Sequence, residues 1–377
     1  MSSPEDFKWM IKYMKLLDPV NGKILDGLGR YGPRNISYLA KSISVPFTTV
    51  TFRLKKLMNR ASLRIKAKLD YSKLGLMKGA IFAEAHPKNS EKLAKLIENT
   101  DYWSYVSNCY GKFNGVYAIF AFPAKQKAEL EKYFAEASRL GILSNYLFFW
   151  TTNLWEGRPN WQFFDFKMRQ WNFRWDGWIE QVLNDSGEMP KNIEDPHAYP
   201  ILVDEMDLLI LKELEKDGTA DFRKIAKVAG VTPQSIRYRF YNHAIERGLL
   251  CEYEISILPY PPDVSDMCAF VFDFVDEKAL AKFTNCLQGK PFVLSYAKII
   301  GRNSLLVNTY IPKKEFSSLI QCLNKLTQKE ILQNFFYVTL DIRSYKRQTI
   351  SYEFFKNGDW TYNSEEKLRR LKEIRGV

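Results

Sequence analysis

The sequence has few of the residues that build disulfide frameworks and metal centres. Its 377 residues include only five cysteines, which are widely spaced, and only three histidines. We therefore expect free, mostly buried thiols in a reducing compartment, the cytoplasm. No histidine lies at ligand spacing from a second histidine, a cysteine or a carboxylate, so the sequence predicts no metal site.

Long apolar runs and catalytic signatures are missing as well. The longest apolar runs have about ten residues and are too short to span a bilayer. The charged N-terminal segment lacks the apolar core of a signal peptide. None of the patterns GxSxG, GxGxxG, HExxH or the Walker loop occurs. We expect no membrane partner, no cofactor and no enzymatic activity.

Acidic residues are outnumbered by basic ones, 43 against 55, which gives a formal net charge of +12. A polyanion is therefore the leading class of partner, and nucleic acid is the commonest polyanion.

The chain repeats its pattern in two halves. Residues 18–25 resemble residues 204–211, Val50 and Arg53 correspond to Ile236 and Arg239, and Gly111 corresponds to Gly301. The matches follow the same order in both halves, which predicts a tandem duplication.

Each half opens with three short helices, predicted from apolar residues at helical spacing. They cover residues 21–29, 35–43 and 47–60 in the first half, and 204–217, 221–229 and 234–247 in the second. A tight turn separates the second and third helix each time, as in a helix-turn-helix. Strands at 62–69 and 250–257 alternate polar and apolar residues and are interpreted as wings.

The outward side chains of these units are the candidate contacts to double-stranded DNA. In the first unit they are Thr48, Thr49, Thr51, Phe52, Lys55 and Lys56, with Arg64, Lys66 and Lys68 on its wing; in the second they are Thr232, Gln234, Ser235, Arg237, Tyr238 and Asn242. Gln234 and Arg237 suit adenine and guanine edges in the major groove, and the lysines suit phosphate.

The two units differ in charge. Residues 19–70 hold eleven basic and two acidic residues, whereas residues 204–257 hold eight basic and ten acidic ones, including Glu252 and Glu254 on the second wing. We expect the first unit to supply most phosphate contacts. The second either touches DNA lightly, turns its acidic first helix away from DNA, or faces a basic protein of the transcription apparatus.

A strand-helix-strand-strand-helix-strand order follows each helical unit. The strands are predicted at 77–85, 102–110, 116–123 and 145–152, then at 267–275, 292–300, 304–311 and 333–342; the helices are predicted at 90–99, 125–140, 277–287 and 313–326. This order is typical of a ferredoxin-like sandwich, and the sheet of the other half would cover its open face. The predicted fold class is α+β, with two winged helix-turn-helix domains alternating with two ferredoxin-like βαββαβ domains.

A tryptophan-rich segment with interleaved arginines follows the first sandwich, and a similar aromatic segment follows the second. Such segments can stack single-stranded bases, but burial against the protein is the favoured interpretation. The predicted boundaries are 1–70, 71–154, 155–200 for the extension and linker, 201–258, 259–345 and 346–377.

This arrangement resembles the Lrp/AsnC family of leucine-responsive transcription regulators. The resemblance is carried by Asp204-x-x-Asp207-x-x-Ile210-Leu211, by residues 222–230, by Ser235-Ile236-x-x-Arg239 and by Gly301, and more weakly by the first half. It implies an intramolecular pseudo-dimer that binds specific DNA sequences and regulates transcription, with basal transcription factors and a second copy of the chain, in a homodimer, as further candidate partners. The second domain of the family resembles a sensor of amino acids and contains a turn of the Gly-x-Tyr-Asp type. The acidic residue of that turn is missing from the corresponding residues 111–115 and 301–304, which argues against amino-acid sensing.

The same architecture is also similar to the sirohaem decarboxylases, which act on a tetrapyrrole that carries several carboxylates. That enzyme is the alternative interpretation. No histidine lies on the strands where its site would be expected.

Overall fold

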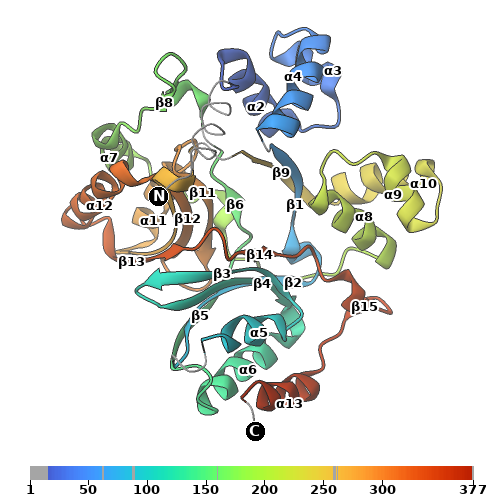
Figure 1. Cartoon of the computed structure of the whole chain (residues 1–377), viewed down its shortest axis with the longest axis vertical. Coiled ribbons are helices and arrows are strands. Elements are labelled where there is room, and N and C mark those ends of the chain that lie inside the picture. Colours follow the sequence, from blue (N-terminus) through green and yellow to red (C-terminus); the bar gives the residue numbers. More distant parts are fainter. Residues whose placement is uncertain are drawn as a thin grey trace.

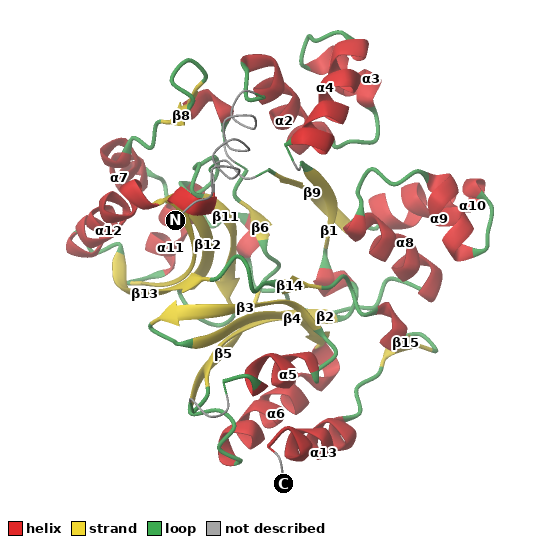
Figure 2. Cartoon of the chain, viewed as in Figure 1, coloured by secondary structure: helices red, strands yellow, loops and turns green. Residues whose placement is uncertain are grey.

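The computed structural model describes residues 16–61, 63–86, 90–158, 160–257, 260 and 262–375, and Ser62 of the first predicted wing lies outside these ranges. These described residues form an α+β fold (Figures 1 and 2), with one ten-stranded sheet and three two-stranded sheets among them.

Three helices open each half, as predicted. In the first half they are α2 (Pro19–Tyr31), α3 (Ile36–Ser42) and α4 (Phe47–Arg60); in the second they are α8 (Glu205–Lys216), α9 (Phe222–Ala229) and α10 (Pro233–Arg239), which continues as a π-helix over Phe240–Ile245. Side-chain caps fix where several of them begin. Asp18 accepts the backbone N–H of Asn21, and Asp204 and Asp207 form a reciprocal capping box.

The prediction that each of these units ends in a wing is wrong. The strands β1 (Arg64–Leu69) and β9 (Leu250–Ser256) pair with each other in a two-stranded antiparallel ribbon between the two helical units (Figure 1). In its register Lys66 lies opposite Glu254 and Lys68 lies opposite Glu252. Opposite charges at facing positions favour such a pairing, although the ion pairs of Lys68, Glu252 and Glu254 are made with residues outside the ribbon.

The predicted βαββαβ order is present in both halves, with bounds within a few residues of those predicted. The first series is β2 (Leu76–Glu84), α5 (Lys92–Glu98), β3 (Trp103–Gly111), β4 (Gly115–Pro123), α6 (Lys127–Arg139) and β5 (Asn145–Thr151). The second is β10 (Ser265–Phe274), α11 (Glu277–Asn285), β11 (Val293–Ile299), β12 (Ser304–Pro312), α12 (Lys313–Gln328) and β13 (Leu332–Leu340).

The strands of the two halves join at both edges. β13 pairs with β3, β5 pairs with β11, and β11 also pairs with β12, so the eight long strands close on themselves. Their inner faces share one apolar core that contains Phe82, Tyr117 and Phe149 from the first half, with Val271 and Leu306 from the second. Each half therefore covers the open sheet face of the other.

The extensions cross between the halves. The first contains β6 (Trp155–Glu156), β7 (Phe164–Asp165), β8 (Gln170–Trp171) and α7 (Trp175–Asn184), and α7 packs on α11 and α12. The second contains β14 (Lys346–Arg347), β15 (Phe355–Lys356), β16 (Asp359–Trp360) and α13 (Ser364–Arg375), and α13 packs on α5 and α6 (Figure 1). Trp150 at the end of β5 and the five tryptophans of the extension (Trp155, Trp161, Trp171, Trp175 and Trp178) all join apolar clusters, so the burial interpretation is confirmed.

Within the described ranges, no helix is both long and apolar enough to cross a membrane. In the same part of the chain no three His, Cys, Asp or Glu side chains are grouped to hold a metal ion. The five cysteines are free thiols, and Cys109, Cys268 and Cys322 are buried.

Candidate functional site

The face of α10 is the first candidate site. Thr232, Gln234, Arg237 and Tyr238 are exposed, whereas Ser235 and Asn242 are half-buried. Thr232 caps the helix by accepting the backbone N–H of Ser235 at 3.2 Å. Ile236 and Phe240 are buried on the opposite side, so α10 presents its polar face to solvent.

A buried carboxylate holds α10 against α8. Asp207 is 3% exposed and accepts hydrogen bonds from Arg239 Nη1 at 2.8 Å and from His243 Nδ1 at 2.8 Å. Arg239 also donates to Asp204 at 2.7 Å. Burial alone would raise the pKa of Asp204, but hydrogen bonds from Arg239 and from backbone amides lower it below its usual value. The network fixes the direction in which α10 faces.

The helix α4 presents the corresponding residues of the first unit. Thr48, Thr51, Phe52 and Lys55 are exposed, and Thr49 and Lys56 are half-buried. The Phe52 side chain is 68% exposed, which leaves an aromatic ring among the basic groups of this face.

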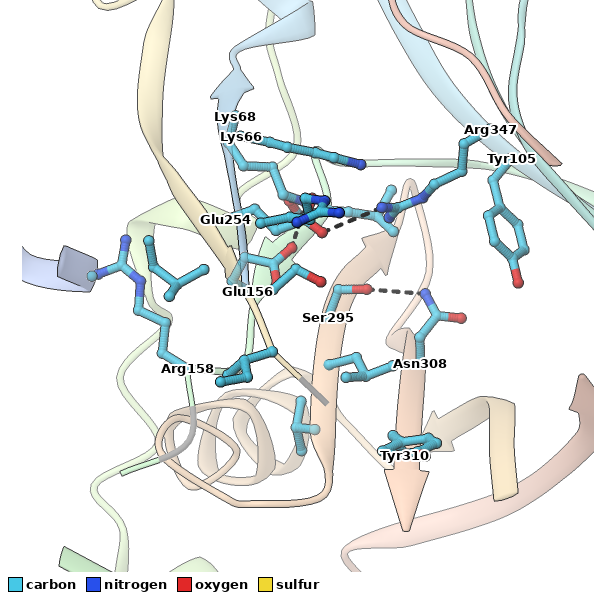
Figure 3. Close-up of a pocket in the computed structure, with 18 of the residues that line it drawn as sticks. Lys66, Lys68, Tyr105, Glu156, Arg158, Glu254, Ser295, Asn308, Tyr310 and Arg347 are labelled. Carbon is cyan, nitrogen blue, oxygen red and sulfur yellow. Dashed lines mark hydrogen bonds and ion pairs between the residues drawn. The ribbon is translucent and has the colours of Figure 1, made fainter. Parts of the chain in front are cut away.

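The three basic residues of β1 lie on the same face of the strand, and all three line one cavity. Arg64 is exposed and donates to the carbonyl of Leu63 at 3.2 Å. Lys66 and Lys68 are half-buried and line a cavity of about 1310 Å³ between the ribbon and the sheet (Figure 3). They therefore do not lie on a free wing: the strand they belong to pairs with β9 and is a wall of this cavity, and their contact with phosphate stays a prediction.

Ion pairs fasten the ribbon to the rest of the molecule across the cavity. Lys68 Nζ lies 2.6 Å from a Glu156 carboxylate oxygen, and Arg347 Nη1 lies 3.3 Å from Glu254 Oε1 (Figure 3). Burial would raise the pKa of Glu254, but the charges of Arg347, Lys68 and Lys66 lower it to about 2. Glu254 therefore stays ionised throughout the neutral pH range.

Arg158 forms a further ion pair with Glu252 at the same end of the ribbon. Glu156 and Arg158 come from the extension that follows the first βαββαβ series, whereas Arg347 comes from β14, in the extension that follows the second series. The ribbon is thus fastened to both extensions.

Two other lysines of the cavity lie outside ion-pair distance of every carboxylate that the structure describes. Neither Lys66 nor Lys78 forms an ion pair with any residue that the structure describes. Lys78 is 7% exposed; its Nζ lies 3.3 Å from Ser104 Oγ and 4.0 Å from the ring centroid of Tyr71. Burial lowers the pKa of Lys78 to about 7 and also lowers the pKa of Lys66.

The nearby carboxylates are occupied elsewhere. Glu215 accepts hydrogen bonds from the Tyr71 hydroxyl and, at 2.7 Å, from the backbone N–H of Ile350, and its pKa is raised by burial. Burial likewise raises the pKa of Glu156 to about 7.

Neutral polar groups complete the cavity wall. Tyr117 donates to Asn308 Oδ1 at 3.1 Å, and Asn308 Nδ2 donates to Ser295 Oγ at 3.1 Å. The buried hydroxyl of Tyr105 has no hydrogen-bond partner among the described residues. The described residues that line the cavity include no histidine.

Sequence reasoning found the faces of α4 and α10 but missed this cavity. Two signals were present: Lys78 interrupts an otherwise apolar strand, and the charges of residues 64–68 and 252–254 are opposite in sign. Arg347, Glu156 and Glu215 lie far from these strands in the sequence, so only the folded chain brings them together.

One family model matches part of the chain, and two solved structures resemble it over nearly its whole length. The AsnC-type helix-turn-helix domain matches residues 203–241. The crystal structure of the siroheme decarboxylase NirDL is 15% identical with a TM-score of 0.56, and the alignment covers 94% of this chain and 97% of that chain. NirDL in co-complex with an iron-uroporphyrin III analogue is 16% identical with a TM-score of 0.56, covering 94% of this chain and 98% of that chain.

A third structure, AsnC of E. coli, is 18% identical with a TM-score of 0.30, covering 40% of this chain and 98% of that chain. No curated protein matches the sequence significantly. The matched segment contains α8, α9 and α10, which are the helices that form and orient the exposed polar face. This chain contains an AsnC-type helix-turn-helix domain at residues 203–241, in a fold that is similar to that of NirDL.

Proposed function

We propose that the protein is a cytoplasmic transcription regulator that binds specific double-stranded DNA sequences. In this proposal it is a tandem pseudo-dimer of two helix-turn-helix units and two ferredoxin-like sandwiches, and it has no catalytic activity. The exposed polar face of α10, within the AsnC-type domain, is the observation that carries the proposal.

The second unit supplies the base readers in this proposal. Gln234 stands at the N-terminal end of α10, where a recognition helix contacts base edges, and Arg237 follows three residues later on the same exposed face. Arginine pairs with guanine and glutamine with adenine in the major groove. The buried Asp207 network fixes the orientation of α10, the helix that carries both residues, relative to α8.

In this proposal the first unit supplies phosphate contacts through the exposed face of α4. Lys55 is exposed and Lys56 is half-exposed on the same helix, and neither forms an ion pair within the described ranges. Phosphate contacts position a protein on DNA and do not distinguish sequences, so this unit would contribute affinity rather than specificity.

The test is a footprint on genomic fragments, followed by Arg237→Ala and Gln234→Ala on the site it identifies. Each change should cost about 1–3 kcal/mol on the cognate site and relax preference at one or two base pairs. Arg223→Ala is the matched control, because Arg223 is an exposed arginine of α9 outside the proposed reading face. Equal losses on cognate and random DNA would contradict base reading by α10.

A second candidate function is favoured by the cavity. The chain matches NirDL over 94% of its length, and one NirDL structure holds an iron-uroporphyrin III analogue. Lys66, Lys68 and Lys78 could bind the carboxylates of a tetrapyrrole in the cavity. Titration with iron uroporphyrin III should then shift the Soret band, and mass spectrometry would detect loss of carboxylate; an unchanged band would reject this candidate.

A further inference from the structure

We propose that the central cavity is an effector site for a small polyanion, and that its occupancy alters DNA affinity through the β1–β9 ribbon. The regulatory part rests on the proposed DNA-binding function. The binding part rests on the cavity alone.

The cavity has more cationic groups than its carboxylates satisfy. Lys68 and Arg347 are paired with Glu156 and Glu254, but Lys66 and Lys78 have no ion-pair partner among the described residues. A buried charge without a partner is costly, and an anion that enters the cavity would remove that cost.

A hydrogen-bond donor lies in the same cavity. The buried Tyr105 hydroxyl, which borders the cavity, lacks a partner within the described part of the chain. Ser104, the neighbouring residue on β3, already contacts Lys78 Nζ. The Tyr105 hydroxyl is therefore a further polar group on the wall of the cavity that Lys66 and Lys78 line.

The volume of the cavity admits a ligand with several anionic groups. At about 1310 Å³ it exceeds the roughly 300–1,000 Å³ of ordinary ligand pockets. Carboxylates and phosphates both satisfy lysine and arginine, so the shared chemistry is that of a multiply charged anion. We therefore propose a di- or tricarboxylate, or a phosphate ester, as the ligand class.

The ribbon makes this site a regulatory one. β1 follows α4, and β9 follows the helices that include α10, so both helical units are attached to one wall of the cavity. The backbone N–H of Gly218 also donates to the Ile65 carbonyl at 2.8 Å, which ties the end of α8 to the ribbon.

An anion would compete with the ion pairs that hold the ribbon. Glu156 on β6 and Arg347 on β14 belong to strands that pair with the large sheet, and they bind Lys68 and Glu254 of the ribbon. A ligand that draws Lys68 and Arg347 to itself weakens these two links. The ribbon and both attached helical units then change position relative to the sheet.

The experiment measures binding and coupling separately on the full chain. Citrate and pyrophosphate serve as probes, with chloride at matched ionic strength as the reference. Calorimetry gives the affinity of each probe, and fluorescence anisotropy gives the Kd for the cognate duplex with and without it. We expect one probe to bind and to change the Kd at least about fivefold, in the range of ordinary allosteric coupling.

Variants locate the effect in the cavity. Lys66→Gln/Lys78→Gln should abolish probe binding and the change in Kd. Lys127→Gln/Lys132→Gln removes the same charge from the exposed face of α6 and should leave both intact. Arg347→Gln, at an exposed position, is a second cavity variant that should weaken probe binding if the double variant does not fold.

Each outcome has a defined meaning. Binding of citrate alone identifies a carboxylate ligand, and binding of pyrophosphate alone identifies a phosphate ligand. Absence of binding heat with both probes overturns the site, and binding without a change in Kd overturns the coupling. If no footprint is found, the DNA-binding proposal fails, while calorimetry still decides whether the cavity binds anions.

Discussion

Lys78 shows how one residue can mark a site. It stands near the start of β2, where the neighbouring residues of the strand are buried and apolar. A lysine that is 7% exposed and has no ion-pair partner destabilises the fold, because burial disfavours its charged form. Its retention there fits a function that uses the charge.

We predict that Lys78→Met stabilises the protein, most strongly at neutral or lower pH. The folded-state pKa of about 7 lies below the usual 10.5, so the unfolded chain binds more protons between these values. The destabilisation caused by Lys78 is therefore complete below pH 7 and diminishes as the pH rises towards 10.5. Urea unfolding at pH 6.5 and pH 9 should show the larger gain, on the order of a few kcal/mol, at pH 6.5.

Lys298→Met is the control for that prediction. Lys298 is 8% exposed, but its Nζ lies 2.6 Å from Asp195, so its removal leaves a carboxylate without its partner and should destabilise the protein. A loss of stability in Lys78→Met at pH 6.5, equal to that of Lys298→Met, would show that the charge of Lys78 is satisfied.

At the scale of elements, the ribbon explains why sequence reasoning succeeded for helices and failed for wings. Apolar spacing placed α4 at its observed bounds, because that signal is local. The partner of a strand is not local. The acidic residues of β9 and the basic residues of β1 were interpreted as two surfaces with different affinity for DNA, whereas they lie opposite each other in one ribbon.

We predict that the salt dependence of DNA binding follows α4 and not β1. Lys55→Gln/Lys56→Gln should lower the slope of log affinity against log salt by up to about 1.8, at about 0.9 for each lost phosphate contact. Lys66→Gln/Lys68→Gln removes the same charge from the cavity wall and should leave the slope nearly unchanged. Both slopes are measured on cognate and scrambled duplexes. A larger decrease of the slope for the β1 variant would show that Lys66 and Lys68 contact DNA.

At the scale of the whole molecule, the two halves depend on each other. The order of elements in each half could be predicted from the sequence, but the exchange of extensions could not, because nothing local in an aromatic segment specifies the half that it covers. Trp178 of the first extension donates through Nε1 to the Cys286 carbonyl at 3.1 Å, and Trp360 of the second donates to the Leu74 carbonyl at 2.6 Å. Each half thus completes the core of the other.

This exchange predicts that the chain unfolds in one cooperative transition, and that Trp178 and Trp360 each stabilise both halves. Trp178→Ala, at a side chain that is 1% exposed, and Trp360→Ala should each cost about 3–5 kcal/mol, the usual range for large-to-small changes in a core. Phe52→Ala is the control, since an exposed ring should change stability by less than about 0.5 kcal/mol. Far-ultraviolet circular dichroism and tryptophan fluorescence should give one midpoint in urea, and both core variants should lower it for both signals. Two separate transitions, with each variant lowering only one of them, would show that the halves fold independently despite their exchanged extensions.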